Sequence, residues 1–318
     1  MKNLFFLALA FTLVTASCTK EYTGNPTNGQ QNNQNNDTGG SGGGGGTGGG
    51  GTGGGGTGGG SAVGPVPNTF TQKVLIEEFT GEWCGYCPDG ALKLEAAVNQ
   101  HPGKVFGAAI HDGDPYEIPS LNSTFQSTFN VSGYPSGMVN RTPSGSQVCL
   151  DRNFWLSFAT SQLANNAVCG LAMTSYTTGT DSFYVQVHAG FNQALTGNHY
   201  LTVYVLEDGI VSNGQANYYN DGSIDPNSPL VGLGNPIVNW EHDHVVRQVL
   251  TAPLGDPIPA SKLVPGGEHV VKFGGRYTGI KKDKMSFVAF VNTTGTTSLD
   301  HKILNVQKAK LYEIKKWD

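Results

Sequence analysis

Two cysteines separated by two residues, Cys84 and Cys87, lie in the segment WCGYCP (83–88). This segment follows an apolar run (74–79) and precedes a stretch with helical character (88–100). Unpaired N–H groups and the macrodipole favour an anion at a helix N-terminus, so we expect Cys84 to ionise at a lower pH than a free thiol. The arrangement favours thiol–disulfide exchange, although this spacing also holds zinc or an iron–sulfur cluster, or closes an inert bridge.

A second motif favours the exchange chemistry. The segment 129–139 reads as a helix end, a turn and an X-Pro bond, Tyr134-Pro135, that opens a short strand. Together with the cysteines, this segment resembles the cis-proline loop of the thioredoxin family. The resemblance implies that Cys84 attacks substrates, that Cys87 resolves the mixed disulfide, and that Trp83, Tyr134 and Pro135 contact an extended substrate.

The strand before the cysteines carries two adjacent carboxylates. Alternation along the strand places Glu78 on one face with Val74 and Ile76, and Glu77 on the other. Glu78 matches the position of the buried acid that relays a proton in thioredoxin, where the family has Asp. Burying a carboxylate is costly, so two interpretations stay open: a catalytic relay, or a partly solvated, salt-bridged residue.

The N-terminus predicts export. Residues 1–17 combine a positive start with an apolar core, which is typical of a signal peptide, and the following Cys18 matches a bacterial lipobox whose cysteine is lipidated. The alternative is an ordinary signal peptide with a chance cysteine. Residues 18–67 are rich in Gly, Asn and Thr and cannot fold alone, which predicts a low-complexity tether.

Two further cysteines, Cys149 and Cys169, flank a stretch with helical character (153–166). Because an exported chain meets an oxidising compartment, we expect these cysteines to form a structural disulfide; a four-cysteine zinc site is the alternative. We predict no bound metal and no cofactor beyond the Cys84–Cys87 disulfide. The net charge of −5 comes from interspersed charges, so nucleic acid is not expected as a partner.

Periodicity divides the remainder of the chain. From 68 to 167, apolar strands alternate with helices, and Phe154, Trp155, Phe158 and Leu163 mark the buried stripe of the last helix. From 168 to 318 the period is two, with strands such as 183–187, 200–206 and 285–291. Together with the resemblance to the thioredoxin family, this order implies an α/β thioredoxin-like domain followed by an all-β sandwich-like domain as the expected fold class.

A long stretch without sustained periodicity, 207–241, interrupts the β-rich half. Loops of this length are often functional, and disorder is the other common explanation. Its segment 221–227 has the composition of a calcium loop but lacks a closing glutamate. The neighbouring His242 and His244 are either two metal ligands on one strand face or two polar strand residues, and no third ligand is visible.

The whole plan resembles outer-membrane lipoproteins of Bacteroidetes, some described as putative adhesins. It implies an exported protein, lipid-anchored in the bacterial cell envelope, in the outer membrane. The resulting hypothesis is a thiol–disulfide oxidoreductase or isomerase acting through Cys84 and Cys87 on protein thiols or disulfides of the envelope, with an unidentified redox partner. The alternative is a surface binding module or adhesin in which Cys84–Cys87 is a permanent bridge.

Overall fold

The computed structural model describes residues 62–318, so Cys18, the signal peptide and most of the predicted tether lie outside it. The first elements, in chain order, are β1 (Val74–Thr80), α1 (Cys87–Gln100), β2 (Val105–His111), α2 (Pro119–Phe129), β3 (Ser136–Val139), η1 (Arg152–Phe154) and α3 (Trp155–Gln162). The apolar run at 74–79 forms β1, and the stretches with helical character at 88–100 and 153–166 form α1 and η1 with α3, to within a few residues.

The second half of the chain is almost entirely β. Its strands are β4 (Cys169–Thr178), β5 (Ser182–Phe191), β6 (His199–Glu207), β7 (Ile210–Ser212), β8 (Trp240–His242), β9 (Val245–Val249), β10 (Asp256–Pro257), β11 (Glu268–Arg276), β12 (Met285–Thr293) and β13 (Ile303–Lys310). Short 3-10 turns occur at η2 (Ala260–Lys262), η3 (Lys282–Lys284) and η4 (Ser298–Asp300). Within residues 62–318, no helix is long and apolar enough to cross a membrane.

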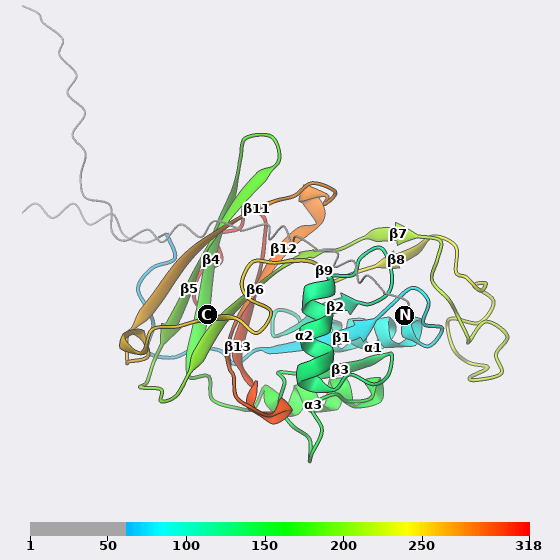
Figure 1. The fold of residues 1–318 in the computed structure, drawn as a ribbon, viewed down its shortest axis with the longest axis horizontal. Coiled ribbons are helices and arrows are strands. Elements are labelled where there is room, and N and C mark those ends of the chain that lie inside the picture. Colours follow the sequence, from blue (N-terminus) through cyan, green and yellow to red (C-terminus); the bar gives the residue numbers. More distant parts are fainter. Residues whose placement is uncertain (1–61) are drawn as a thin grey trace, which may run out of the picture. The chain divides into compact units, whose positions relative to one another are not determined.

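One sheet runs through both halves of the chain, as Figure 1 shows. Its strand order is β13-β12-β6-β9-β2-β1-β3, and β10 pairs with β6 outside this path. The junction between the halves is short: β2 and β9 pair in parallel at Ala109 and Val245, and the Ala109 N–H donates to His244 O at 2.8 Å. Strands of the second half thus extend the sheet of the first.

The expected fold class is therefore wrong. The described chain consists mainly of mixed and antiparallel sheets with few helices, and it is not an α/β thioredoxin domain followed by a separate β-sandwich. The physical reason lies in what period-two patterns report. They show that a strand is half buried, but they do not show which strand lies beside it. The sequence pattern of β6 and β9 therefore did not indicate that these strands extend the sheet of the first half.

Three main apolar clusters hold the layers together. The face of β1 with Val74 and Ile76 packs with α1 and α3, whereas its Leu75 and Phe79 face packs with α2 and with side chains of β6, β12 and β13. The other face of β6 and β12 packs against the three-stranded sheet β11-β5-β4. Trp155, the first residue of α3, is fully buried, whereas Phe154, the last residue of η1, is 61% exposed, so the predicted place of Phe154 in the buried stripe is wrong.

Candidate functional site

The two cysteines of the C-x-x-C segment form a closed disulfide in which the sulfur atoms are 2.11 Å apart. Cys87 is the first residue of α1, and the cis Tyr134-Pro135 bond lies just before β3. Both cysteines are buried: Cys84 is 4% exposed and Cys87 1%. The sulfur atoms therefore lie within the packed structure and not on an open surface.

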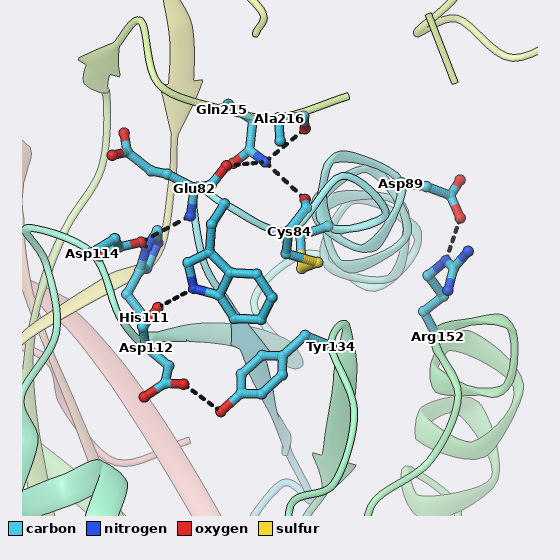
Figure 2. The surroundings of a disulfide bond; sticks show 12 residues. Glu82, Cys84, Asp89, His111, Asp112, Asp114, Tyr134, Arg152, Gln215 and Ala216 are labelled. Carbon is cyan, nitrogen blue, oxygen red and sulfur yellow. Dashed lines mark hydrogen bonds and ion pairs between the residues drawn. A yellow bond between two sulfur atoms is a disulfide. The ribbon is translucent and has the colours of Figure 1, made fainter. Parts of the chain in front are cut away.

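The long loop 213–239 covers the disulfide turn. Backbone N–H groups of Ala216 and Tyr218 donate to Glu82 O at 2.7 Å and to Gly85 O at 2.9 Å. The Gln215 side chain donates to Cys84 O at 3.1 Å, as Figure 2 shows. This loop lies within the aperiodic stretch 207–241, for which the sequence left a functional loop and disorder as alternatives. It is ordered and hydrogen-bonded to the disulfide turn.

A glycine between the cysteines makes this cover possible. A Cβ atom added to Gly85 would lie 2.3 Å from ring atoms of Tyr218, which is closer than real Cβ contacts allow. The Tyr218 ring therefore rests directly on the backbone of the disulfide turn. The same ring meets Tyr86 edge-on, with centroids 5.2 Å apart.

Large aromatic side chains surround the covered disulfide. Three of them are exposed to solvent although their rings are largely apolar: Trp83 at 50%, Tyr86 at 42% and Tyr218 at 51%. Trp83 is held by an Nε1–H bond to Asp112 O at 2.7 Å and by an edge-on contact with Tyr134, with centroids 5.3 Å apart. The Tyr134 hydroxyl donates to Asp112 Oδ2 at 2.9 Å (Figure 2). We call Trp83, Tyr86, Tyr134 and Tyr218 the aromatic cluster.

Glu78 lies fully buried behind the disulfide turn. A Cβ atom added to Gly90 of α1 would lie 2.5 Å from Glu78 Oε1 and 2.8 Å from Pro135 Cβ, so these three residues pack closely. Among the residues that the structure describes, Glu78 Oε1 has no hydrogen-bond partner. Burial raises the pKa of Glu78 to about 8 against weaker opposing effects of His244 and Arg152. The interpretation of Glu78 as a partly solvated, salt-bridged residue is wrong.

The adjacent Glu77 is paired on the other face of β1. Arg141 donates from Nε and Nη2 to its carboxylate, both at 2.7 Å, and the Tyr204 hydroxyl donates to Oε1 at 2.9 Å. Arg141 is completely buried, and its guanidinium lies 4.9 to 5.4 Å from the ring centroids of Phe125, Phe129 and Phe290. The sequence pattern missed this network; the acidic residue on an apolar strand was its only signal.

Cys149 and Cys169 are free thiols, so the predicted structural disulfide is wrong. Cys149 Sγ lies 3.7 Å from Phe129 O, whereas Cys169 begins β4 inside the second-half core. Burial raises the pKa of both thiols to about 12. Both thiols are consequently protonated at neutral pH, and the four-cysteine zinc alternative has no geometric support.

The two neighbouring histidines point to different partners. His242 Nε2 lies 3.0 Å from Ser212 Oγ and 3.5 Å from Glu82 Oε1. His244 Nε2 lies 3.2 Å from Glu95 Oε2. No group of three or more His, Cys, Asp or Glu side chains in residues 62–318 is arranged to hold a metal ion, and this includes the calcium-like segment 221–227. The two imidazoles do not share a site.

His242 predicts a loss of stability in acid. Burial first, and then His111, lower its pKa to about 4, against the opposing effect of Asp114. Because the unfolded chain binds this proton below pH 6.5 and the folded chain does not, stability should fall between pH 6.5 and 4, by up to about 3 kcal/mol. His242→Gln should remove this part of the acid loss in urea unfolding at pH 7.5 and 4.5. An unchanged pH dependence would contradict the assignment.

Comparison with known families now places the chain. The family model described as outer membrane protein Omp28 matches residues 122–315, more than half of the sequence. The chain belongs to the Omp28 family. No curated protein matches the chain.

Several solved structures resemble the chain to different degrees. HBP35 of Porphyromonas gingivalis is similar with a TM-score of 0.61, 22% identity, and 78% of each chain covered. A protein from Agrobacterium tumefaciens has a TM-score of 0.48 at 14% identity, over 76% of this chain and 95% of its own. A domain of the outer membrane lipoprotein Omp28 from P. gingivalis has a TM-score of 0.28 at 16% identity, over 46% and 88%.

These findings correct the assignment to the thioredoxin family. The family shown is Omp28, the similar structure is HBP35, and the Cys84–Cys87 pair is a closed, buried bridge, so the description as a thioredoxin-like disulfide oxidoreductase is wrong. The expected outer-membrane location is confirmed, because the family to which the chain belongs is one of outer membrane proteins. A surface or outer-membrane protein is the functional class that the family gives.

Proposed function

We propose that this protein is a binding module of the outer-membrane surface, and that the aromatic cluster around the buried disulfide is its binding face. The observation that carries the proposal is a contrast in exposure. Cys84 and Cys87 are 4% and 1% exposed, while Trp83 beside them is 50% exposed. The disulfide turn therefore presents rings to a partner and keeps its sulfur atoms covered.

Trp and Tyr suit this role because they combine a large apolar surface with few rotatable bonds. They are the residues most enriched among those that dominate the free energy of protein–protein binding. In the aromatic cluster, Asp112 accepts hydrogen bonds from both Trp83 and Tyr134, which fixes two rings before any partner arrives. Ordered side chains lose little entropy on binding, so this preorganisation favours affinity.

The charges beside the rings indicate the kind of partner. The Asp112 carboxylate accepts a hydrogen bond from the Tyr134 hydroxyl, and Glu117 accepts one from the neighbouring Gly113 N–H at 3.0 Å. Within residues 62–318, neither carboxylate forms an ion pair. We therefore infer that the partner is a protein segment with apolar side chains flanked by Lys or Arg, whose charges the two carboxylates attract.

A peptide selection tests the proposal. Peptides enriched from a random displayed library on the full chain should carry aromatic or aliphatic residues next to basic ones. Trp83→Ala should weaken their binding about thirtyfold or more, because centrally placed Trp side chains contribute at least about 2 kcal/mol. Dissociation constants from fluorescence anisotropy give the measurement, and Tyr218→Ala serves as a second probe of the same face.

Phe154→Ala is the matched control, because Phe154 is a 61% exposed aromatic residue outside the aromatic cluster. It should leave the dissociation constants unchanged. Selected peptides that ignore Trp83→Ala and Tyr218→Ala, or that depend on Phe154 alone, would overturn the assignment of the binding face.

A further inference from the structure

A pocket of about 550 Å³ lies apart from the aromatic cluster, between β7, β9 and the turn before β12. Its apolar wall is formed by Ile210, Val211 and Ile280. Val211 is 53% exposed, so this wall of the pocket is open to solvent. Pockets that bind small organic molecules have volumes in this range and combine apolar walls with a few polar groups.

The polar side of the pocket carries an excess positive charge. Glu207, 3% exposed at its side chain, accepts a bond from Arg247 Nη1 and another from the Lys281 backbone N–H at 2.9 Å. Arg247 and Lys281 line the pocket together with this one carboxylate, so two cations face one anion. In the described part of the chain, the Lys281 ammonium forms no ion pair.

The guanidinium of Arg247 is held in place but keeps N–H donors that are not used within the described residues. Its carbon lies 5.7 Å from the centroid of the Tyr116 ring, another residue of the pocket. Only Nη1 bonds to Glu207 among the described residues, which leaves Nε and Nη2 without a protein acceptor. A fixed fork of N–H donors beside a free ammonium matches the two oxygens of a carboxylate.

We infer that this pocket binds a small organic acid, with its carboxylate at Arg247 and Lys281 and a short aliphatic chain against Val211 and Ile280. One net positive charge matches one anionic group. An inorganic anion would make no favourable contact with the apolar wall, whereas an aliphatic chain would. The inference is independent of the aromatic cluster, whose residues do not line this pocket.

Isothermal titration calorimetry of the full chain with hexanoate tests the inference, and hexan-1-ol serves as the uncharged probe of equal length. Hexanoate should bind at least about tenfold more tightly than the alcohol at constant ionic strength, because hydrogen bonds to charged groups are the stronger ones. Lys281→Met should weaken hexanoate about tenfold and leave the alcohol unchanged. Val211→Glu should abolish binding of hexanoate.

Lys282→Met is the matched control, because Lys282 lies in the same turn but over the Tyr277 ring and outside the pocket. It should leave both affinities unchanged, as should Trp83→Ala, which separates this site from the proposed binding face. Equal affinities for acid and alcohol, no heat of binding for hexanoate, or equal effects of Lys281→Met and Lys282→Met would each overturn the inference.

Discussion

Replacing Arg141 with methionine is expected to lower the free energy of unfolding by about 3–5 kcal/mol, because it leaves the buried Glu77 carboxylate without its counter-charge. Arg141 and Glu77 side chains are both 0% exposed, and they meet through two hydrogen bonds of 2.7 Å. Only the Tyr204 hydroxyl would then remain bonded to the carboxylate. Urea unfolding at pH 7 measures the loss.

The double variant Glu77→Gln with Arg141→Met is the control for this prediction. The double variant removes both charges together and roughly keeps the volume of the side chains. It should recover a large part of the stability lost by the single variant, because replacing a whole buried ion pair with uncharged side chains costs much less than removing one partner. A double variant as unstable as the sum of the two single variants would show that packing, and not the unpaired charge, dominates.

Replacing Glu78 with glutamine is expected to stabilise the protein by about 5 kcal/mol above pH 8. Burial raises the pKa of Glu78 from 4.5 to about 8, and each unit corresponds to about 1.4 kcal/mol. Below pH 4.5 the carboxyl is protonated in both states and costs nothing. Between pH 4.5 and 8 the unfolded chain has lost this proton while the folded chain keeps it, so the wild type is progressively destabilised over this range, and the loss levels off above pH 8.

The measurement is the difference in unfolding free energy between Glu78→Gln and the wild type at pH 4 and pH 8.5. The difference should grow from pH 4 to pH 8.5 in favour of Glu78→Gln. A Glu78→Gln protein that is less stable than the wild type at both pH values would mean that the carboxyl has a partner it needs.

The two carboxylates show how far sequence reasoning reaches in this chain. Alternation alone places Glu77 and Glu78 on opposite faces of β1, and the structure confirms this placement. The partner of Glu77 was not readable, because Arg141, Tyr204 and Phe290 come from three separate elements that only the shared sheet brings together. Local pattern predicts the face of a strand; long-range pairing determines what that face meets.

The predictions of the fold and of the site were wrong for the same reason: the sequence does not show long-range contacts. Motif spacing located the disulfide turn and the cis-proline loop, and hydrophobic period located most strands and helices. Neither signal reports that the aperiodic loop 213–239 folds over Cys84, because its contacts are single hydrogen bonds from residues such as Gln215 and Ala216. The sequence alone, which does not show this loop, suggested exchange chemistry for the two cysteines. In the structure the loop covers the disulfide turn, and the aromatic cluster is what remains exposed.

The affinity of a selected peptide for the full chain carrying both Cys84→Ser and Cys87→Ser distinguishes binding by the aromatic cluster from binding by the sulfur atoms. The bridge closes a very short loop, so its loss should lower stability by only about 2 kcal/mol. If the rings bind the partner, the dissociation constant should stay within about threefold of the wild-type value, while Trp83→Ala raises it about thirtyfold. Binding that vanishes with the sulfur atoms and survives Trp83→Ala would contradict the account.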